Sequence, residues 1–225
     1  MIYEDLFDYK KQEEMRSFFL NMLAPLGKKK DFKKGDLIKI YEEERFVGIV
    51  INGKVKGSLY SSKGTEKLLY ILRAGEIFGE SNYFVSGGSH SIIKAMEPST
   101  ISFIPKNILD SYLDKNPKAY SFFIHSITRK YRISISQMSD AIFSSSKTKV
   151  ANTLYRLTVQ DSKKEANEYI IKTHLTHQTL ANLIGCSRIT VTKVLKELRQ
   201  LNILDIRDKK IVVKDLDALK SMCQS

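Results

Sequence analysis

Cysteine is scarce in this chain of 225 residues, which excludes a disulfide framework and an iron–sulfur cluster. Two cysteines, Cys186 and Cys223, cannot form a disulfide framework, so a reducing cytoplasm is the expected setting. No cysteine precedes Cys186, which rules out the ligand set of an iron–sulfur cluster. His174 and His177 lie three residues apart but have no further ligand beside them, so we expect no metal site.

Long apolar runs and a targeting segment are also missing. No apolar stretch has the length that a membrane-spanning helix needs. The chain starts with the acidic segment MIYEDLFDYK, which does not have the pattern of a signal peptide. We therefore expect a cytoplasmic protein that makes no contact with membranes. A hydrophobic fraction of 42% is sufficient for one large or two modest cores.

Acidic residues are outnumbered by basic ones, and the excess is uneven along the chain. Lys and Arg total 37 against 25 Asp and Glu, which gives a net charge of +12. Residues 147–225 carry 15 basic and 8 acidic side chains, whereas residues 1–146 carry 22 and 17. The higher density of positive charge in the last third indicates a domain that binds phosphate groups of nucleic acid.

Two short helices joined by a tight turn are predicted between residues 175 and 203. Thr176 and Ser187 are candidate N-caps, and Gly185 can adopt the left-handed conformation that ends the first helix. Apolar residues recur at helical spacing in both helices, and the small Ala181 lets the helices approach each other. This pattern is typical of a helix-turn-helix, whose second helix lies in the DNA major groove. A helical hairpin with a solvated basic face is the alternative.

One face of the second helix carries the side chains that we expect to read DNA. Arg188 can make a bidentate contact to a guanine edge, and Ile189 offers an apolar contact to a thymine methyl group. Lys193 lacks the bidentate fork of arginine, and Lys196 is assigned to phosphate. The expected DNA-binding residues are Thr176, His177, Gln178, Ser187, Arg188, Ile189, Thr192, Lys193 and Lys196.

The segment GCSRITVTKVLKELRQLNIL closely resembles the recognition segment of the Crp-Fnr transcription regulators, and the resemblance extends upstream over nearly the whole chain. It implies an α+β fold with three parts. These are an effector-binding antiparallel β-roll (residues 1–116), a dimerisation helix and hinge (117–146), and a winged-helix DNA-binding domain (147–225). The resemblance also implies a homodimer on a palindromic operator of double-stranded DNA, with RNA polymerase as a partner if the protein is an activator.

The β-roll is also indicated by the sequence pattern itself. Short apolar runs alternate with turn signals from Lys28 to Ile104, which predicts an antiparallel barrel or roll. Asn52-Gly53 lies between VGIVI and KVKGSLY and predicts a two-residue hairpin. Further along, ILDIRDKKIVVKD predicts two strands around a turn, as in a β-wing.

A long helix is predicted from Pro117 to about Phe143, followed by a hinge of three serines, residues 144–146. Its apolar residues are spaced three or four apart, and a single stripe of this length needs a partner. The resemblance implies the same helix of a second subunit, while packing on the chain's own β-roll is the alternative. The expected dimer interface consists of Ile124, Ile127, Tyr131, Ile135, Met138 and Ile142.

The effector pocket departs from the pattern of the family's cyclic-nucleotide sensors. Those sensors carry a Gly-Glu pair for the ribose, followed by an Arg-Ser or Arg-Thr pair for the cyclic phosphate. Gly79 and Glu80 match the first pair, but His90 precedes Ser91 where arginine is expected. Histidine is mostly neutral at pH 7, so we expect an effector other than cyclic AMP. Glu80 is then retained for structure alone.

Several other classes of function stay open from the residues, and a cyclic-nucleotide sensor is one of them. Haem ligation would use His90 or His125. A ligand-independent regulator would have a filled pocket. We expect no enzyme, because a cupin-type metal centre needs clustered ligands and the β-region offers only His90.

Short matches in EKLLY, KAMEPST and NILD resemble the halorespiration regulators of the family. Those regulators bind chlorinated phenols between the β-roll and the long helix, which implies a cation facing the pocket. Arg129 and Lys130 are the candidates for that cation. The expected effector-binding residues are Phe78, Gly79, Glu80, Tyr83, His90, Ser91, Arg129 and Ser134.

Overall fold

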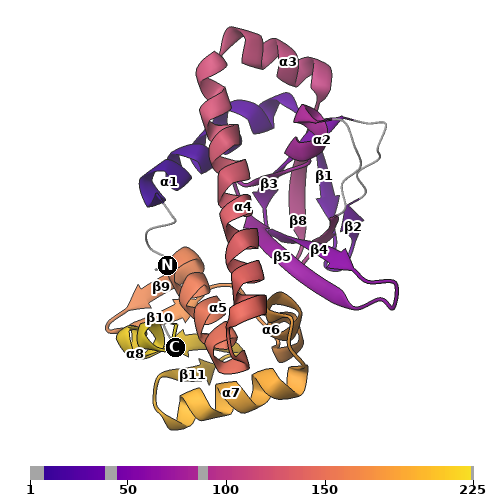
Figure 1. Cartoon of the computed structure of the whole chain (residues 1–225). Coiled ribbons are helices and arrows are strands. Elements are labelled where there is room, and N and C mark those ends of the chain that lie inside the picture. The colour runs from indigo at the N-terminus through magenta and orange to yellow at the C-terminus, as the bar shows by residue number, and fades with distance from the viewer. Residues whose placement is uncertain (1–7, 39–44, 86–90, 224–225) are drawn as a thin grey trace. The chain divides into compact units, whose positions relative to one another are not determined.

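The computed structural model describes residues 8–38, 45–85 and 91–223 (Figure 1). His90, a predicted effector contact, lies outside these residues. The chain divides into two compact units, and the boundary between them falls at residues 133 and 134, within the helix α4 (Tyr120–Phe143). No described helix is long and apolar enough to cross a membrane.

The first unit begins with helices that cover one side of a β-structure. Asp8 caps α1 (Tyr9–Phe18) by accepting a hydrogen bond from the Lys11 backbone N–H at 2.9 Å. The helix continues through a π-helical turn, η2 (Phe19–Leu23), and a 3₁₀ turn, η3 (Ala24–Leu26). Figure 1 shows α1 beside α4, and Met15, Phe19 and Phe123 of these elements share one buried cluster.

Among the described residues of the first unit, eight strands form two antiparallel sheets, as expected for a β-roll. The first sheet has the order β1-β8-β3-β6 and the second the order β2-β7-β4-β5. In chain order the strands are β1 (Lys28–Phe32), β2 (Leu37–Ile38), β3 (Phe46–Asn52), β4 (Lys54–Tyr60), β5 (Glu66–Arg73), β6 (Ile77–Phe78), β7 (Ile92–Ala95) and β8 (Ser99–Pro105).

Strand β3 shows how one strand serves two cores. Side chains alternate between the faces of a strand. Phe46 and Val50 therefore join the cluster between the two sheets, while Val47 and Ile49 join the cluster under the helices. Because of this alternation, β3 contributes side chains to the core between the sheets and also to the core under the helices.

The predicted hairpin at Asn52-Gly53 is wrong. Strand β3 pairs with β6 and β8, whereas β4 pairs with β5 and β7, so this turn carries the chain from one sheet to the other. Gly53 has φ of +81°, and a Cβ there would lie 2.4 Å from the carbonyl oxygen of Pro98. The glycine is required by the turn, but it does not join paired strands.

Helices complete the first unit. A short helix, α2 (Glu80–Phe84), begins directly after Gly79, which has φ of +85°. The chain continues through α3 (Lys106–Lys115) and a 3₁₀ turn, η4 (Pro117–Ala119), into α4. The long helix was predicted from Pro117, and its first residues form this 3₁₀ turn.

The apolar seam of α4 is exposed on the single chain. A different face, with Phe123, Arg129 and Ile133, is buried. Packing on the chain's own roll therefore does not account for the seam, and the dimer interface stays a prediction. The seam residues, which are 40% to 64% exposed, are Ile124, Ile127, Tyr131, Ile135, Met138 and Ile142.

The second unit holds helices and a four-stranded sheet of order β11-β12-β10-β9. The Ser145 hydroxyl caps the helix that follows α4 by accepting a hydrogen bond from the Thr148 N–H at 3.1 Å. One helix therefore ends just before the predicted serine hinge, and the next begins within it. After α4 the elements are α5 (Ser146–Asp161), β9 (Ser162–Glu165), β10 (Glu168–Ile171), α6 (His177–Ile184), α7 (Arg188–Gln200), β11 (Leu204–Arg207), β12 (Lys210–Val213) and α8 (Leu216–Ser221).

Candidate nucleic-acid interface and effector site

The two helices α6 and α7 begin and end as the sequence predicts. Thr176 accepts a hydrogen bond from the Thr179 N–H, and Ser187 accepts one from the Thr190 N–H, each at 3.0 Å. Gly185 has φ of +80°, and its N–H donates to the Ala181 carbonyl at 2.8 Å. These local bonds fix the turn between the helices, which makes the helix-turn-helix.

Opposite faces of α7 have different surroundings. Val191, Leu195 and Leu198 are buried and belong to the predicted apolar stripe. Ile189 is 69% exposed, although it is apolar. Exposed along the same surface are Arg188, Thr192, Lys193 and Lys196. The predicted DNA-reading side chains of α7 therefore share one solvent-facing surface.

The remaining predicted DNA-binding residues lie at the starts of the two helices. Thr176 and Ser187 use their hydroxyl groups as caps. Gln178 is exposed, and its Nε2 donates to Asn182 Oδ1 at 2.8 Å. His177 is half-buried, and its Nδ1 lies 2.8 Å from Thr192 Oγ1 of α7.

The wing is the hairpin of β11 and β12, whose turn residues Asp208 and Lys209 have φ of +49° and +61°. The Arg207 side chain does not project from the wing as a free cation, because its guanidinium donates to the two Glu168 carboxylate oxygens at 2.7 and 2.8 Å. The partner carboxylates raise the pKa of Arg207. Lys209 and Lys210 are exposed at the turn, and the basic run in RDKK is the sequence signal for this further candidate position for phosphate contact.

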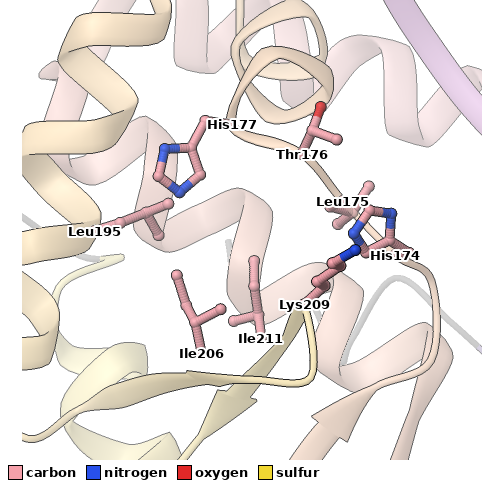
Figure 2. Close-up of a pocket in the computed structure, with 8 residues that line it drawn as sticks. All are labelled: His174, Leu175, Thr176, His177, Leu195, Ile206, Lys209 and Ile211. Carbon is pink, nitrogen blue, oxygen red and sulfur yellow. The ribbon is translucent and has the colours of Figure 1, made fainter.

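A small pocket of about 180 Å³ lies between the helix-turn-helix and the wing (Figure 2). Figure 2 shows His177 on one side and Ile206 and Ile211 of the wing strands on the other. Its lining consists of His174, Leu175, Thr176, His177, Leu195, Ile206, Lys209 and Ile211. Within the described ranges, no group of three or more His, Cys, Asp or Glu residues could hold a metal ion.

A charged pair forms the centre of the candidate effector site in the first unit. Lys130 of α4 pairs with Glu80 at the start of α2, and both side chains are about 90% buried or more. The Lys130 amino group also donates to the Ile77 carbonyl at 2.7 Å and lies 5.4 Å from the centroid of the Tyr70 ring. The Tyr70 hydroxyl is 3.3 Å from Ser91 Oγ. Two predicted residues, Glu80 and Ser91, thus lie around Lys130 and Tyr70.

Two other predicted effector residues, Phe78 and Tyr83, lie elsewhere in the first unit. Phe78 is buried in the core between the sheets, where a Cβ on Gly48 would lie 2.3 Å from its ring. Tyr83 belongs to the cluster under the helices, and its hydroxyl donates to Asp110 at 2.6 Å. Burial and this carboxylate raise the pKa of Tyr83. Ser134 lies one helical turn after Lys130 on α4 and is exposed.

Arg129, one of the two cations predicted to face the pocket, faces a second charged cluster. It lies 3.2 Å from the carboxylate of Glu76, which is buried and also accepts from Arg16 Nη2 at 2.6 Å and Gln12 Nε2 at 2.9 Å. Burial alone raises the pKa of Glu76, but the charges of Arg129 and Arg16 outweigh it and lower the pKa below its usual value. Lys130, its neighbour, is the cation that contacts Glu80 and Tyr70.

One of the two candidate haem ligands has a protein partner. His125 Nε2 lies 3.0 Å from Gln12 Oε1 in the same cluster. Burial and the charge of Arg129 lower the pKa of His125. The ring thus belongs to the buried network around Glu76.

Two family models match the chain and together cover both units. Residues 29–116 match the cyclic nucleotide-binding domain, and residues 148–222 match the Crp-like helix-turn-helix domain. Among curated proteins, the cAMP-activated global transcriptional regulator CRP of Haemophilus influenzae is 29% identical over 182 residues, which are 80% of each chain. The chain belongs to the Crp-Fnr family of transcription regulators.

This Crp-Fnr regulator has further relatives of similar length. A CRP-like cAMP-activated global transcriptional regulator of Mycobacterium tuberculosis is 26% identical over 76% of each chain. The structure of CooA from Carboxydothermus hydrogenoformans shares the fold, with a TM-score of 0.79 over 97% of each chain and 20% identity. The predicted family and fold class are confirmed, and the chain is a DNA-binding transcription regulator with a cyclic-nucleotide-binding domain. Its curated relatives are regulators rather than enzymes.

Proposed function

We propose that this Crp-Fnr regulator binds a palindromic operator as a homodimer, under the control of a small anionic effector other than cyclic AMP. The effector would bind at Lys130, between the β-roll and α4. The observation that carries this proposal is the pair of Lys130 with Glu80, because the glutamate that matches the ribose-binding residue is already bonded to a lysine. A cyclic nucleotide would have to break this pair, and His90 would have to replace the phosphate-binding arginine.

The surroundings of Lys130 suit an aromatic anion. The amino group supplies the positive charge, and the Tyr70 ring lies 5.4 Å from it, with the Tyr70 hydroxyl 3.3 Å from Ser91 Oγ as a hydrogen-bonding pair. An anionic effector would compete with Glu80 for Lys130. Release of Glu80 would also affect α2, since Glu80 is the first residue of that helix.

Helix α4 is the element through which the effector would act on DNA binding. Lys130 lies on it in the first unit. In the second unit, Asp140 of the same helix accepts from Asn152 of α5 at 2.7 Å. These two contacts are ten residues apart, roughly 15 Å along one helix. A shift of α4 at Lys130 would therefore be carried to α5 and bias the placement of the recognition helices.

The homodimer would be held by the exposed seam of α4. An apolar stripe that is 40% to 64% exposed over six residues is unfavourable in water, and a second copy of the helix would cover it. Half-sites would then be about one helical turn apart, roughly 34 Å.

The test is calorimetric titration of the full-length protein with cyclic AMP, a chlorinated phenol and an aromatic carboxylate at neutral pH. We expect no binding of cyclic AMP at micromolar concentration, and binding of an aromatic anion that Lys130→Gln weakens at least tenfold. Lys118→Gln is the matched control, because Lys118 is an exposed lysine just before α4. A micromolar or tighter dissociation constant for cyclic AMP would overturn the proposal.

A ligand-independent regulator is the second candidate, and one observation favours it. Lys130 already contacts a carboxylate, a backbone carbonyl and an aromatic ring within the chain. In that case Lys130→Gln and Glu80→Gln would change the stability of the fold but leave the affinity for DNA unchanged. None of the anions would then change operator binding in a fluorescence anisotropy titration.

A further inference from the structure

The hydroxyl group of Thr192 is directed toward partners within the chain, although Thr192 lies on the exposed face of α7. Its Oγ1 donates to the backbone carbonyl of Arg188 at 2.9 Å. The same oxygen lies 2.8 Å from His177 Nδ1 of α6. Because the hydroxyl proton goes to Arg188, the histidine nitrogen is the donor in the second bond. The hydroxyl therefore has both a donor and an acceptor partner within the chain.

His177 is in turn fixed by its own surroundings. It is the first residue of α6 and half-buried, and its ring lines the pocket between the helix-turn-helix and the wing. Figure 2 shows the ring beside Leu195, with Ile206 and Ile211 of the wing strands beyond it. Apolar packing on one side and the bond to Thr192 on the other define the orientation of the ring.

We propose that His177 is a positioning residue for base recognition: it holds the Thr192 hydroxyl inward, so that Thr192 presents its methyl group to DNA. Ile189 lies three residues earlier on the same face and is 69% exposed. Together they form an apolar pair that contacts two thymine methyl groups in each half-site. The inference deepens the proposed function, because it rests on α7 reading the operator.

The test uses the operator selected from random DNA by the full-length protein. Each thymine of a half-site is replaced by deoxyuridine, which removes only the methyl group. We expect affinity to fall about fourfold at each of two positions, the effect of burying one methyl group. A half-site without thymine, or one in which deoxyuridine has no effect, would refute the inference.

Two variants of Thr192 decide which part of its side chain reads DNA. Thr192→Val keeps a methyl group and removes the hydroxyl, so the deoxyuridine effect should persist at both positions. Thr192→Ser keeps the hydroxyl and removes the methyl, so the effect should vanish at one position and remain at the position read by Ile189. If Thr192→Val instead abolished the effect at one position and Thr192→Ser kept it at both, the hydroxyl would be the group that reads the base, which contradicts the proposal.

A double-mutant cycle tests the role of His177. His177→Phe keeps a ring in the pocket but removes the donor, which frees the Thr192 hydroxyl to turn outward. It should reduce the deoxyuridine effect at the Thr192 position by at least half in the Thr192 protein, and leave it unchanged in the Thr192→Val protein. Equal reduction in both backgrounds would mean that His177 only supports the helix, and the positioning role would be wrong.

Arg188→Ala separates failure of this inference from failure of the proposed function. If Arg188→Ala leaves the selected motif unchanged, α7 does not read the bases, and both fail together. If Arg188→Ala relaxes one base pair of the motif while deoxyuridine has no effect, only the thymine-methyl inference fails.

Discussion

Removing the charge of Glu76 should destabilise the β-roll more than any surface change, because this carboxylate is shared by several buried donors. Its side chain is 2% exposed, and those of Arg16 and Arg129 are each 9% exposed. Arg16 donates to it through Nε at 3.2 Å and Nη2 at 2.6 Å, and the Arg73 N–H donates at 3.2 Å. Glu76→Gln keeps the shape but removes the buried negative charge that Arg16 and Arg129 share, and Arg16 then keeps its exposed partner Glu13.

The expected cost is about 3–5 kcal/mol in the free energy of unfolding, the range for removing one partner of a buried ion pair. The matched control is Glu13→Gln. Glu13 also pairs with Arg16, but its side chain is 70% exposed, so we expect a change below about 1 kcal/mol. Because both variants remove one negative charge beside Arg16, their difference measures the combined effect of burial and of the further donors to Glu76.

The assay is urea unfolding of the full chain, followed by hydrogen–deuterium exchange of peptides from α1, β5 and β6. Exchange in these peptides reports on the first unit apart from the second. Equal destabilisation by Glu76→Gln and Glu13→Gln would refute the reasoning, since it would mean that the buried carboxylate contributes no more than an exposed one.

The dependence on pH gives a second check of the same cluster. The pKa of Glu76 is lowered in the folded state, so its contribution is present above the ordinary carboxyl value of 4.5 and is lost as pH falls through the lower folded value. Wild-type stability should therefore fall over this acidic range more steeply than that of Glu76→Gln. Parallel curves for the two proteins would contradict the assignment.

Two further predictions concern the dimer and the DNA contacts. The double variant Tyr131→Asp, Met138→Asp should be monomeric by light scattering and bind operator DNA much more weakly, because both residues lie on the exposed seam of α4. Ser121→Asp, outside the six seam residues, is the control. A dimer in the double variant would exclude this interface. Lys196→Ala should weaken binding to all DNA sequences alike and lower the slope of log affinity against log salt by about one, whereas Lys172→Ala should leave it unchanged. A change in sequence preference with Lys196→Ala would instead show that this lysine reads a base.

The helix-turn-helix could be predicted from the sequence because its signals act over a few residues. Thr176 and Ser187 each cap a helix through a bond to the third residue on, and Gly185 has the left-handed conformation that ends α6. The Asn52-Gly53 signal is equally local, but strand pairing is not. The turn was recognised correctly, while the partners of the two flanking strands are set by residues far along the chain.

The candidate effector site was harder to predict, because residues that are close in the sequence lie in different parts of the first unit. Phe78 ends β6 in the core between the sheets, and Tyr83 lies under the helices. Only Gly79 and the first turn of α2 separate them, so a set of neighbouring residues does not become one pocket. Tyr70, which lies beside Lys130, has no signal in the sequence that distinguishes it from an ordinary strand residue.

Arg129 and Lys130 show how two adjacent cations on α4 acquire different roles. Successive helix residues point about 100° apart, so the two side chains reach acids on either side of β6, Glu76 before it and Glu80 after it. Glu76 is held by four donor groups from Gln12, Arg16 and Arg73 in addition to Arg129. Exchanging a partner at Arg129 would disturb that whole cluster, whereas exchange at Lys130 involves one carboxylate and one carbonyl. We therefore expect α4 to stay anchored at Arg129 while its contact at Lys130 responds to a ligand, which is why the effector is placed at Lys130.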